Sequence, residues 1–360
     1  MSLTPQAGIM NIALYEGGKS SIAGRSDVLK LSSNENPLGP PPAAIKAISE
    51  AAVDVHRYPS TDHAELRAAI AKAYGLEAER IICGVGSDEV LQFVCQAFAG
   101  AGDEIVYTEH GFSMYPILAH MAGATPVQVA EAERVVSVDN ILAAVTEATR
   151  IVMLANPANP TGTMLPEEEL ARLARGLPAH VILVIDGAYT EYAEGYTGGA
   201  ELARDLPNVL MTRTFSKVYG LGGLRIGWGY AAREMIDVMT RIRQPFNLST
   251  VQLAAAQAAV EDANWVPNCT RLNAAQRARL TGALRQLGVA CDASHANFVL
   301  ARFGDEAEAV AVDLALQAEG ILVRRVKGYG FPEGLRMTVG DEAQTGRLIA
   351  ALTKWREGQA

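Results

Sequence analysis

The sequence has little that would suit a membrane or a nucleic acid as a partner. Its longest apolar stretches, such as Val181 to Ile185, have the length of a strand and are too short to cross a bilayer. It has no block of Lys or Arg, and its 40 acidic and 31 basic side chains leave a formal net charge of -9. Such a charge gives no electrostatic footprint for nucleic acid or an anionic membrane. We therefore expect neither partner, and a few placed groups must hold any anionic ligand.

Motifs for disulfides and metals are also missing. The six histidines include no HExxH sequence and no pair four residues apart, so we expect no metal site. The first residues have no charged segment that leads into an apolar run, which favours a cytoplasmic protein. The four cysteines form no CxxC pair, and we expect them to be reduced, small buried hydrophobes: Cys83, Cys95, Cys269 and Cys291.

Short β-rich runs alternate with longer amphipathic ones along most of the chain. Runs such as Val181 to Ile185 are apolar on both faces, which is typical of strands in a sheet that helices cover on both sides. We predict an α/β fold with a mainly parallel, doubly wound, seven-stranded sheet, whose ligands would bind at the carboxyl ends of the strands. The predicted strands are Arg80 to Cys83, Glu104 to Thr108, Thr125 to Val129, Ile151 to Ala155, Val181 to Ile185, Val209 to Arg213 and Ile226 to Tyr230.

The pattern along the chain indicates an arm and two domains. Residues 1–30 show little periodicity and are predicted to form an N-terminal arm. A break at Gln244 to Asn247 precedes an Ala-rich stretch and then helix and strand material of a different character, so we place a boundary near residue 265. The large domain is predicted to span residues 51–264. A smaller α+β domain would combine residues 31–50 with 265–360.

A lysine follows the predicted strand Val209 to Arg213, where a ligand of the sheet would lie. Lys217 comes directly after Ser216, and several glycines and Arg225 follow it. These residues suit an amine beside a phosphate, because glycine allows close approach and arginine forks onto phosphate oxygens. The Ser-Lys pair alone fits a solvated surface lysine better, because most lysines are exposed.

Three other strand ends carry polar groups. Asp186 follows five buried apolar residues, where a carboxylate needs a partner such as a protonated ring nitrogen or the first N–H groups of a helix. Asn159 lies between two X-Pro steps in a rigid turn, which is also consistent with a purely structural turn. Ser87 and Asp88 follow a Gly-Val-Gly sequence at a predicted helix start, where an anion can bind, although such a short motif is weak evidence.

The order and spacing of these elements resemble the fold-type I, class II aminotransferases that use pyridoxal 5′-phosphate, and within them the histidinol-phosphate aminotransferase family. The resemblance spans nearly the whole chain. Its markers are Leu31 to Gly39, Arg57-Tyr58-Pro59, Gly86 to Glu89, Asn156 to Gly162, Asp186 with Tyr189, Ser216 to Arg225, Asn297-Phe298-Val299 and Leu335 to Gly340.

This resemblance implies a pyridoxal phosphate site at the strand ends. Lys217 would form a Schiff base with the cofactor and then move the proton between the substrate Cα and the cofactor C4′. Asp186 would pair with the ring nitrogen, while Asn159 and Tyr189 would hydrogen-bond the phenolic oxygen. The other implied cofactor contacts are Ser87, Asp88, Thr214, Ser216 and Arg225 at the phosphate and Phe112 stacked on the ring.

The resemblance also implies substrate-binding groups and a second subunit. Tyr58 would reach the cofactor phosphate of the neighbouring subunit, so a homodimer with shared active sites is expected. Arg336 would bind a substrate anion, and Arg324, which Arg325 adjoins, would bind a second anion at the phosphate end of the substrate. The implied wall residues of the substrate pocket are Asn36 and Tyr15.

The implied reaction transfers an amino group from histidinol phosphate to 2-oxoglutarate in histidine biosynthesis. The alternatives are an aromatic amino acid aminotransferase, a phosphothreonine decarboxylase of the same fold and an inactive cofactor-binding regulator. Regulators of this kind usually carry a helical DNA-binding domain, for which the aperiodic arm leaves no room. Two places depart from the family's pattern: the arm reads Tyr15-Glu16-Gly17-Gly18-Lys19, and Gly187 stands where Glu is common.

Overall fold

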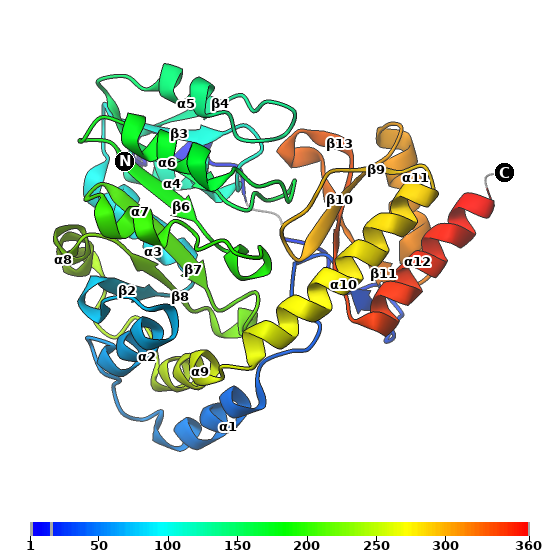
Figure 1. Cartoon of the computed structure of the whole chain (residues 1–360), viewed down its shortest axis with the longest axis horizontal. Helices are drawn as coiled ribbons and strands as arrows, with labels where there is room; N and C mark the ends of the chain where they lie inside the picture. Colours follow the sequence, from blue (N-terminus) through cyan, green and yellow to red (C-terminus); the bar gives the residue numbers. More distant parts are fainter. Residues whose placement is uncertain (1–2, 15–16, 359–360) are drawn as a thin grey trace.

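The computed structural model describes residues 3–14 and 17–358 and has two bodies, each built on its own sheet. The larger body carries a seven-stranded sheet and the smaller one a four-stranded sheet. Figure 1 shows the long helix α10 (Trp265–Gln286) crossing from one body to the other. Within the described ranges, no helix is both long enough and apolar enough to cross a membrane.

The seven-stranded sheet has the strand order β2-β8-β7-β6-β5-β3-β4. Strands β4, β3, β5, β6 and β7 pair in parallel, whereas β8 is antiparallel to both β2 and β7. This arrangement confirms the predicted mainly parallel sheet. Its strands are β2 (Ile81–Gly84), β3 (Glu104–Thr108), β4 (Thr125–Val129), β5 (Thr149–Ala155), β6 (Ile182–Asp186), β7 (Val209–Thr214) and β8 (Gly227–Tyr230).

Both faces of this sheet are buried, which explains why its strands read as continuous apolar runs. In β6, Leu183 and Ile185 belong to the hydrophobic core on one face, and Ile182 and Val184 belong to the core on the other. Because successive side chains of a strand point to opposite faces, helices must cover both sides, as predicted for a doubly wound sheet. Three of the cysteines are buried in these cores and Cys291, in the small body, is half-buried.

The helices of the large body divide between the two cores. The first core takes side chains from α1 (Pro42–Ala51), α2 (Ala64–Tyr74), α5 (Val138–Ala144), α6 (Glu167–Gly176), α7 (Ala200–Asp205) and α9 (Thr250–Glu261). The second takes them from α3 (Ser87–Phe98), α4 (Met114–Ala122) and α8 (Arg233–Ile242). Short 3-10 helices are η1 (Ile9–Asn11), η2 (Ala52–Asp54), η3 (Ala78–Arg80), η4 (Thr190–Tyr192), η5 (Gly222–Leu224) and η6 (Lys327–Tyr329).

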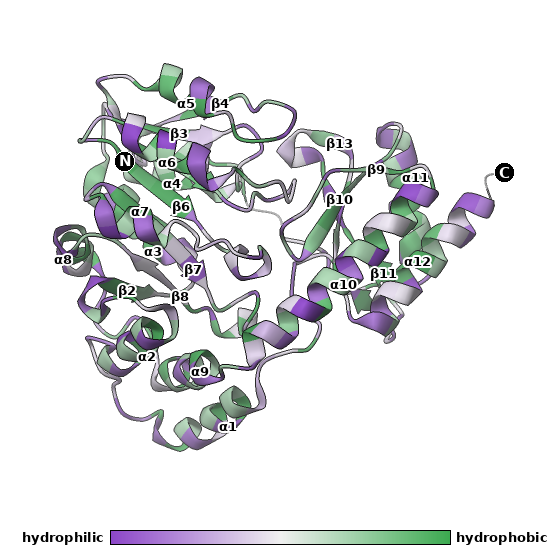
Figure 2. Ribbon diagram, viewed as in Figure 1, coloured by the Kyte–Doolittle hydropathy of each residue, from purple (hydrophilic) through white to green (hydrophobic). Residues whose placement is uncertain are grey.

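The small body is an antiparallel sheet with helices packed against it. Its strands lie in the order β12 (Arg324–Val326), β13 (Phe331–Thr338), β10 (Phe298–Arg302) and β9 (Ala290–Cys291). Helices α11 (Glu306–Ala318) and α12 (Glu342–Glu357) and the end of α10 share a core with this sheet. Figure 2 shows these three helices striped in purple and green, as amphipathic helices are. The arm joins this body where β1 (Leu29–Lys30) pairs in parallel with β11 (Ile321–Leu322).

We had predicted that residues 31–50 belong to the small domain, but the structure divides them between the two bodies. Leu31 belongs to the core of the small body, but Ala44 belongs to a core of the large one. The reason is that α1 packs against α9, so that Ala44 and the partly buried Ile48 join the apolar core beneath the large sheet. The other predicted limit, near residue 265, coincides with the start of α10 at Trp265. The division into two domains otherwise stays a prediction.

Candidate active site

A cavity of about 520 Å³ lies at the carboxyl ends of the central strands of the large sheet. Its lining includes Ala155, Asp186 and Thr214, which are the last residues of β5, β6 and β7. The small body and the arm close its other side, for example with Arg336 and Gly18. This volume is in the usual range for a small-molecule site, and its place is where ligands of such sheets bind.

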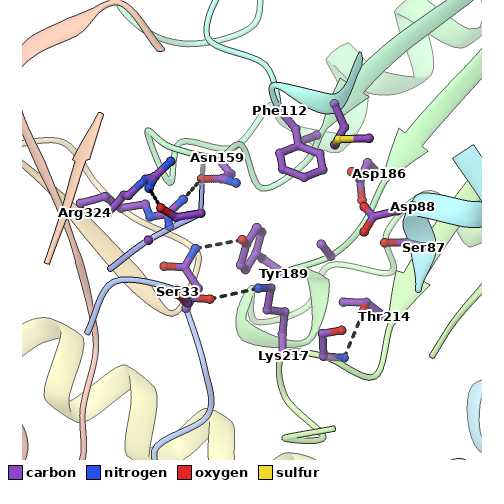
Figure 3. Close-up of a pocket in the computed structure, with 18 of the residues that line it drawn as sticks. Ser33, Ser87, Asp88, Phe112, Asn159, Asp186, Tyr189, Thr214, Lys217 and Arg324 are labelled. Atoms are coloured by element: carbon purple, nitrogen blue, oxygen red, sulfur yellow. Dashed lines mark hydrogen bonds between the residues drawn. The ribbon is translucent and has the colours of Figure 1, made fainter. Parts of the chain in front are cut away.

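Lys217 lies in this cavity and not on the surface. It follows β7 by three residues, and its Nζ donates a hydrogen bond to the carbonyl oxygen of Ser33 at 3.3 Å (Figure 3). Burial and the nearby guanidinium of Arg336 lower the pKa of Lys217 to about 8 from 10.5. This shift raises the neutral, nucleophilic fraction of the amine by roughly two orders of magnitude at neutral pH.

Asp186 presents a buried carboxylate to the same cavity. The side chain is 5% exposed, and it accepts hydrogen bonds from the Tyr115 hydroxyl at 3.0 Å and from the Thr212 hydroxyl at 3.3 Å. Burial raises the pKa of Asp186 to about 6, because desolvation disfavours the charged form. A cation in the cavity would offset this penalty, so the site is suited to a protonated ring nitrogen.

The start of α3 provides an anion site at one end of the cavity. Ser87 and Asp88 begin this helix, and its N-cap residue is Gly86, which has no side chain to accept from the first N–H groups. Arg225 adds positive charge, since its guanidinium contacts the carboxylate of Asp88 at 2.9 Å and the hydroxyl of Ser216 at 3.1 Å. A Cβ atom at Gly227 would lie 2.1 Å from the backbone nitrogen of Ser87, so only glycine permits this approach of β8 to the helix start. Free N–H groups beside a guanidinium suit a phosphate.

Asn159 and Tyr189 add two more polar side chains to the lining of the cavity. The Oδ1 of Asn159 accepts a hydrogen bond from the Nη1 of Arg336 at 2.5 Å, which leaves the NH₂ group of Asn159 to donate elsewhere. The Tyr189 hydroxyl accepts a hydrogen bond from the Nδ2 of Asn34 at 2.9 Å. Figure 3 shows Phe112 across the cavity from Lys217, and the ring of Phe112 packs edge-on against Tyr115 at 5.9 Å.

The two arginines of the small body reach the cavity because of their strand register. Arg324 of β12 lies directly opposite Arg336 of β13, so both side chains project from the same face of the sheet. Arg325 projects from the other face and pairs with Glu306 at 3.0 Å. Arg324 donates a hydrogen bond to the carbonyl oxygen of Gly17 in the arm. Like charges directly opposite each other are unfavourable, so this pair indicates an anionic ligand.

Three predicted residues lie elsewhere or outside the described part of the chain. Asn36 is buried beside the cavity, where its Nδ2 donates to the carbonyl oxygen of Val218 at 2.7 Å, so it supports the loop of Lys217 and does not line the cavity. Tyr58 is 83% exposed and stacks on Phe246 with ring centroids 4.6 Å apart. Tyr15 lies outside the described residues.

Several lining residues were not identified from the sequence. Ser33, Asn34 and Tyr329 all line the cavity. The hydroxyl of Tyr329 lies 3.1 Å from that of Ser113, so it links the small body to the loop that carries Phe112. The segment Leu31 to Gly39 was a marker of the family resemblance, but its sequence carries no sign of which atoms face a ligand.

The groups that line the cavity fit pyridoxal phosphate. An anion site at the start of α3 suits its phosphate, and the Asp186 carboxylate suits its basic ring nitrogen. The donors of Asn159 and Tyr189 suit its ring oxygen, and the amine of Lys217 suits its aldehyde. Across the described part of the chain, no three His, Cys, Asp or Glu side chains gather closely enough to hold a metal ion.

Comparison with known proteins gives consistent results. The family model described as aminotransferase class I and II matches residues 26–352. Two proteins named histidinol-phosphate aminotransferase are similar over 98% or more of both chains: one from Ruegeria pomeroyi at 65% identity and one from Jannaschia sp. at 60%. Among solved structures, the histidinol-phosphate aminotransferase of Sinorhizobium meliloti in complex with pyridoxal-5'-phosphate is similar with a TM-score of 0.91 and 29% identity. The similarity covers 100% of this chain and 99% of the Sinorhizobium meliloti chain.

Proposed function

Because this chain belongs to the family of class I and II aminotransferases, we propose that it transfers the amino group of histidinol phosphate to 2-oxoglutarate, with pyridoxal phosphate as cofactor, in histidine biosynthesis. The observation that carries the proposal is the shared cavity. Lys217, Asp186 and the start of α3 come from three strand ends and converge there, and each suits a different chemical group of one cofactor.

The bound cofactor supplies an aldehyde that joins to amines and a ring that takes up electrons from the substrate. Lys217 would provide the amine that joins to this aldehyde and would carry the proton to and from the substrate Cα. Asp186 would keep the ring nitrogen protonated, while Asn159 and Tyr189 would donate to the ring oxygen. The N–H groups of Ser87 and Asp88 would hold the phosphate. The remaining cofactor contacts in the proposal are Thr214, Ser216, Arg225 and Phe112.

The paired arginines explain how two different substrates share one site. Histidinol phosphate carries a phosphate, and 2-oxoglutarate carries two carboxylates, so each brings an anion to Arg324 or Arg336. Arginine forks onto either group. An aromatic amino acid has no second anion, so it would leave the Arg324 guanidinium without its ligand.

This difference predicts the preferred amino donor. With 2-oxoglutarate as acceptor, we expect kcat/KM for histidinol phosphate to exceed that for phenylalanine by at least about a hundredfold. Steady-state kinetics on the purified enzyme measures both values. A preference for phenylalanine would replace the proposed substrate by an aromatic amino acid.

Neighbouring arginines offer a matched control for the same prediction. In the first half-reaction, with the amino donor alone, Arg324→Gln should lower the efficiency with histidinol phosphate by roughly 10- to 100-fold, because it removes a charge-assisted contact. Arg325→Gln should leave the efficiency nearly unchanged, since Arg325 pairs with Glu306 on the other face of β12. Equal losses in the two variants would contradict the role of Arg324.

A homodimer with shared active sites is a further part of the proposal. Apolar side chains lie exposed near one another around Tyr58: Tyr58 is 83% exposed and Val55 65%, both line a surface pocket with Phe246, and Phe246 stacks on Tyr58. Such a patch is typical of a subunit interface. In the proposed dimer, Tyr58 reaches the cofactor phosphate of the partner subunit, as the family resemblance implies.

Mixed dimers test this sharing. Tyr58→Ala should weaken cofactor binding, and Lys217→Ala should be inactive. If Tyr58 serves the other subunit, a hybrid of the two variants has one intact site, so at a low cofactor concentration the mixture should be more active than either parent. Activity that never exceeds the parents' average would assign Tyr58 to its own subunit or to no site.

The location of the enzyme is the last part of the proposal. Free cysteines fit a reducing compartment, and three of the four are buried. We therefore place the enzyme in the cytoplasm.

A further inference from the structure

Three successive residues of one segment each contact a different group of the proposed site. The carbonyl oxygen of Ser32 accepts from Arg336 at 3.0 Å, and that of Ser33 accepts from Lys217 at 3.3 Å. The side chain of Asn34 donates to the Tyr189 hydroxyl at 2.9 Å. The first two contacts use backbone atoms, which any residue would supply. The third depends on the asparagine side chain itself.

Asn34 is held firmly by its surroundings. It is 1% exposed, and its backbone has a φ of +56°, a left-handed conformation that asparagine and aspartate adopt more readily than most residues. Its carbonyl oxygen accepts from the Nδ2 of Asn297 at 3.0 Å. Its N–H donates to the Thr338 hydroxyl at 2.9 Å, and that hydroxyl donates back to the Asn34 Oδ1 at 3.2 Å.

This reciprocal pair of bonds fixes which way the Asn34 amide points. The backbone N–H can only donate, so the Thr338 oxygen must accept there, and its proton then needs an acceptor. The Oδ1 of Asn34 is that acceptor. With the amide reversed, the NH₂ group would face Thr338 and the buried hydroxyl proton would lose its partner, which is costly. Thr338 therefore holds the NH₂ group of Asn34 toward Tyr189.

We propose that Asn34, oriented by Thr338, is a positioning residue that directs the Tyr189 proton to the ring oxygen of the cofactor. A tyrosine hydroxyl has one proton and can accept at its lone pairs. Because Asn34 donates to it, the proton of Tyr189 is not used on this side and is free to point into the cavity. Burial raises the pKa of Tyr189, so the hydroxyl stays protonated and remains a donor.

The inference rests on the proposed function, because Tyr189 must lie beside the ring oxygen of the cofactor. It adds a cause for the direction of that hydrogen bond. If Asn34 and Thr338 only held the backbone together, replacing them would change stability and would not change the electronic state of the bound cofactor through Tyr189. The two roles can therefore be separated.

The absorbance of the loaded enzyme provides the measurement. A donor at the ring oxygen favours the deprotonated chromophore, in which that oxygen carries more negative charge. When the near-visible absorbance is titrated with pH, its midpoint is the pH at which half of the chromophore is deprotonated. Tyr189→Phe should therefore move this midpoint upward by about one unit. Thr338→Val removes the hydroxyl that orients Asn34 and should shift the midpoint in the same direction by a smaller amount. Thr338→Ser keeps the hydroxyl and is the matched control, with an unchanged midpoint.

A second variant reverses the hydrogen bond without straining the backbone. Asn34→Asp keeps the size and tolerates the left-handed conformation, but an ionised carboxylate only accepts, so Tyr189 would donate to it and not to the cofactor. The midpoint should rise as far as in Tyr189→Phe or further. The cofactor dissociation constant and the thermal midpoint of the cofactor-free protein, measured in parallel, report any general loosening of the fold.

The Tyr189→Phe background separates the possible outcomes. There, Thr338→Val should add no further shift, because no tyrosine proton remains to be directed. If Thr338→Val shifts the midpoint equally in the native and the Tyr189→Phe proteins, the inference is overturned. It is also overturned if Tyr189→Phe moves the midpoint but neither Thr338→Val nor Asn34→Asp does. In that last case the proposed place of Tyr189 still stands. An unchanged midpoint in Tyr189→Phe itself removes Tyr189 from the ring oxygen and overturns both.

Discussion

Replacing Lys217 by alanine is expected to abolish the near-visible absorption that the native enzyme gains when it binds pyridoxal phosphate. The amine of Lys217 is the group proposed to join to the cofactor, and its lowered pKa of about 8 makes it reactive near neutral pH. Turnover should fall by about 10⁴-fold or more, because the same amine is proposed to move the proton at the substrate Cα. Absorbance spectra and steady-state rates measure the two effects.

Two controls distinguish the loss of this amine from a loss of structure. Lys217→Arg keeps a cation in the cavity but has no nucleophilic amine, so it should lack the absorption as well. The cofactor should still bind to Lys217→Ala without the covalent link, since Asp186 and the start of α3 remain. An alanine variant that kept both the native absorption and the native rate would show that Lys217 is not the joining residue.

The Asp186→Asn variant is expected to bind the cofactor and to lose roughly 10²- to 10³-fold in kcat. Asparagine has nearly the same size, but it is neutral and no longer favours a protonated ring nitrogen. The ring then takes up electrons less readily, and removal of the Cα proton becomes slow. An amino donor deuterated at Cα tests this step. Its primary isotope effect on kcat should be larger in Asp186→Asn than in the native enzyme.

Thr212→Val is the matched control for Asp186. It removes the hydrogen bond of 3.3 Å to the carboxylate but leaves the charge in place. Its kcat should stay much closer to the native value than that of Asp186→Asn. Native turnover in Asp186→Asn would mean that the carboxylate does not hold the ring proton.

The sequence alone was enough to predict the large sheet and the side of it on which the site lies. Apolar runs on both faces indicated a sheet covered on two sides, and the structure confirms this with separate cores around Leu183 and Val184. The carboxyl ends of parallel strands share an edge, so the polar residues Asp186 and Lys217 were predicted to meet. Lys217 lines the cavity, although its own dipeptide favoured a surface lysine.

Contacts between distant segments could not be predicted in the same way. The sequence of α1 does not indicate which body its apolar side chains join, and its packing on α9 places it with the large one. The choice between Arg324 and Arg325 needed the register of β12 against β13, which fixes the face from which each side chain projects. Asn34 and Thr338 are separated by 304 residues, and nothing in either local sequence indicates their hydrogen bonds.

The most direct test of the account is to map the amine to which the cofactor is joined. Sodium borohydride converts a cofactor joined to an amine into a stable secondary amine, which survives digestion and can be found by mass spectrometry. We predict that the added pyridoxyl phosphate mass lies on Lys217, in the peptide that contains Ser216, and that Lys217→Ala gives no labelled peptide. A label on another lysine of the native enzyme, or no label at all, would contradict the central claim.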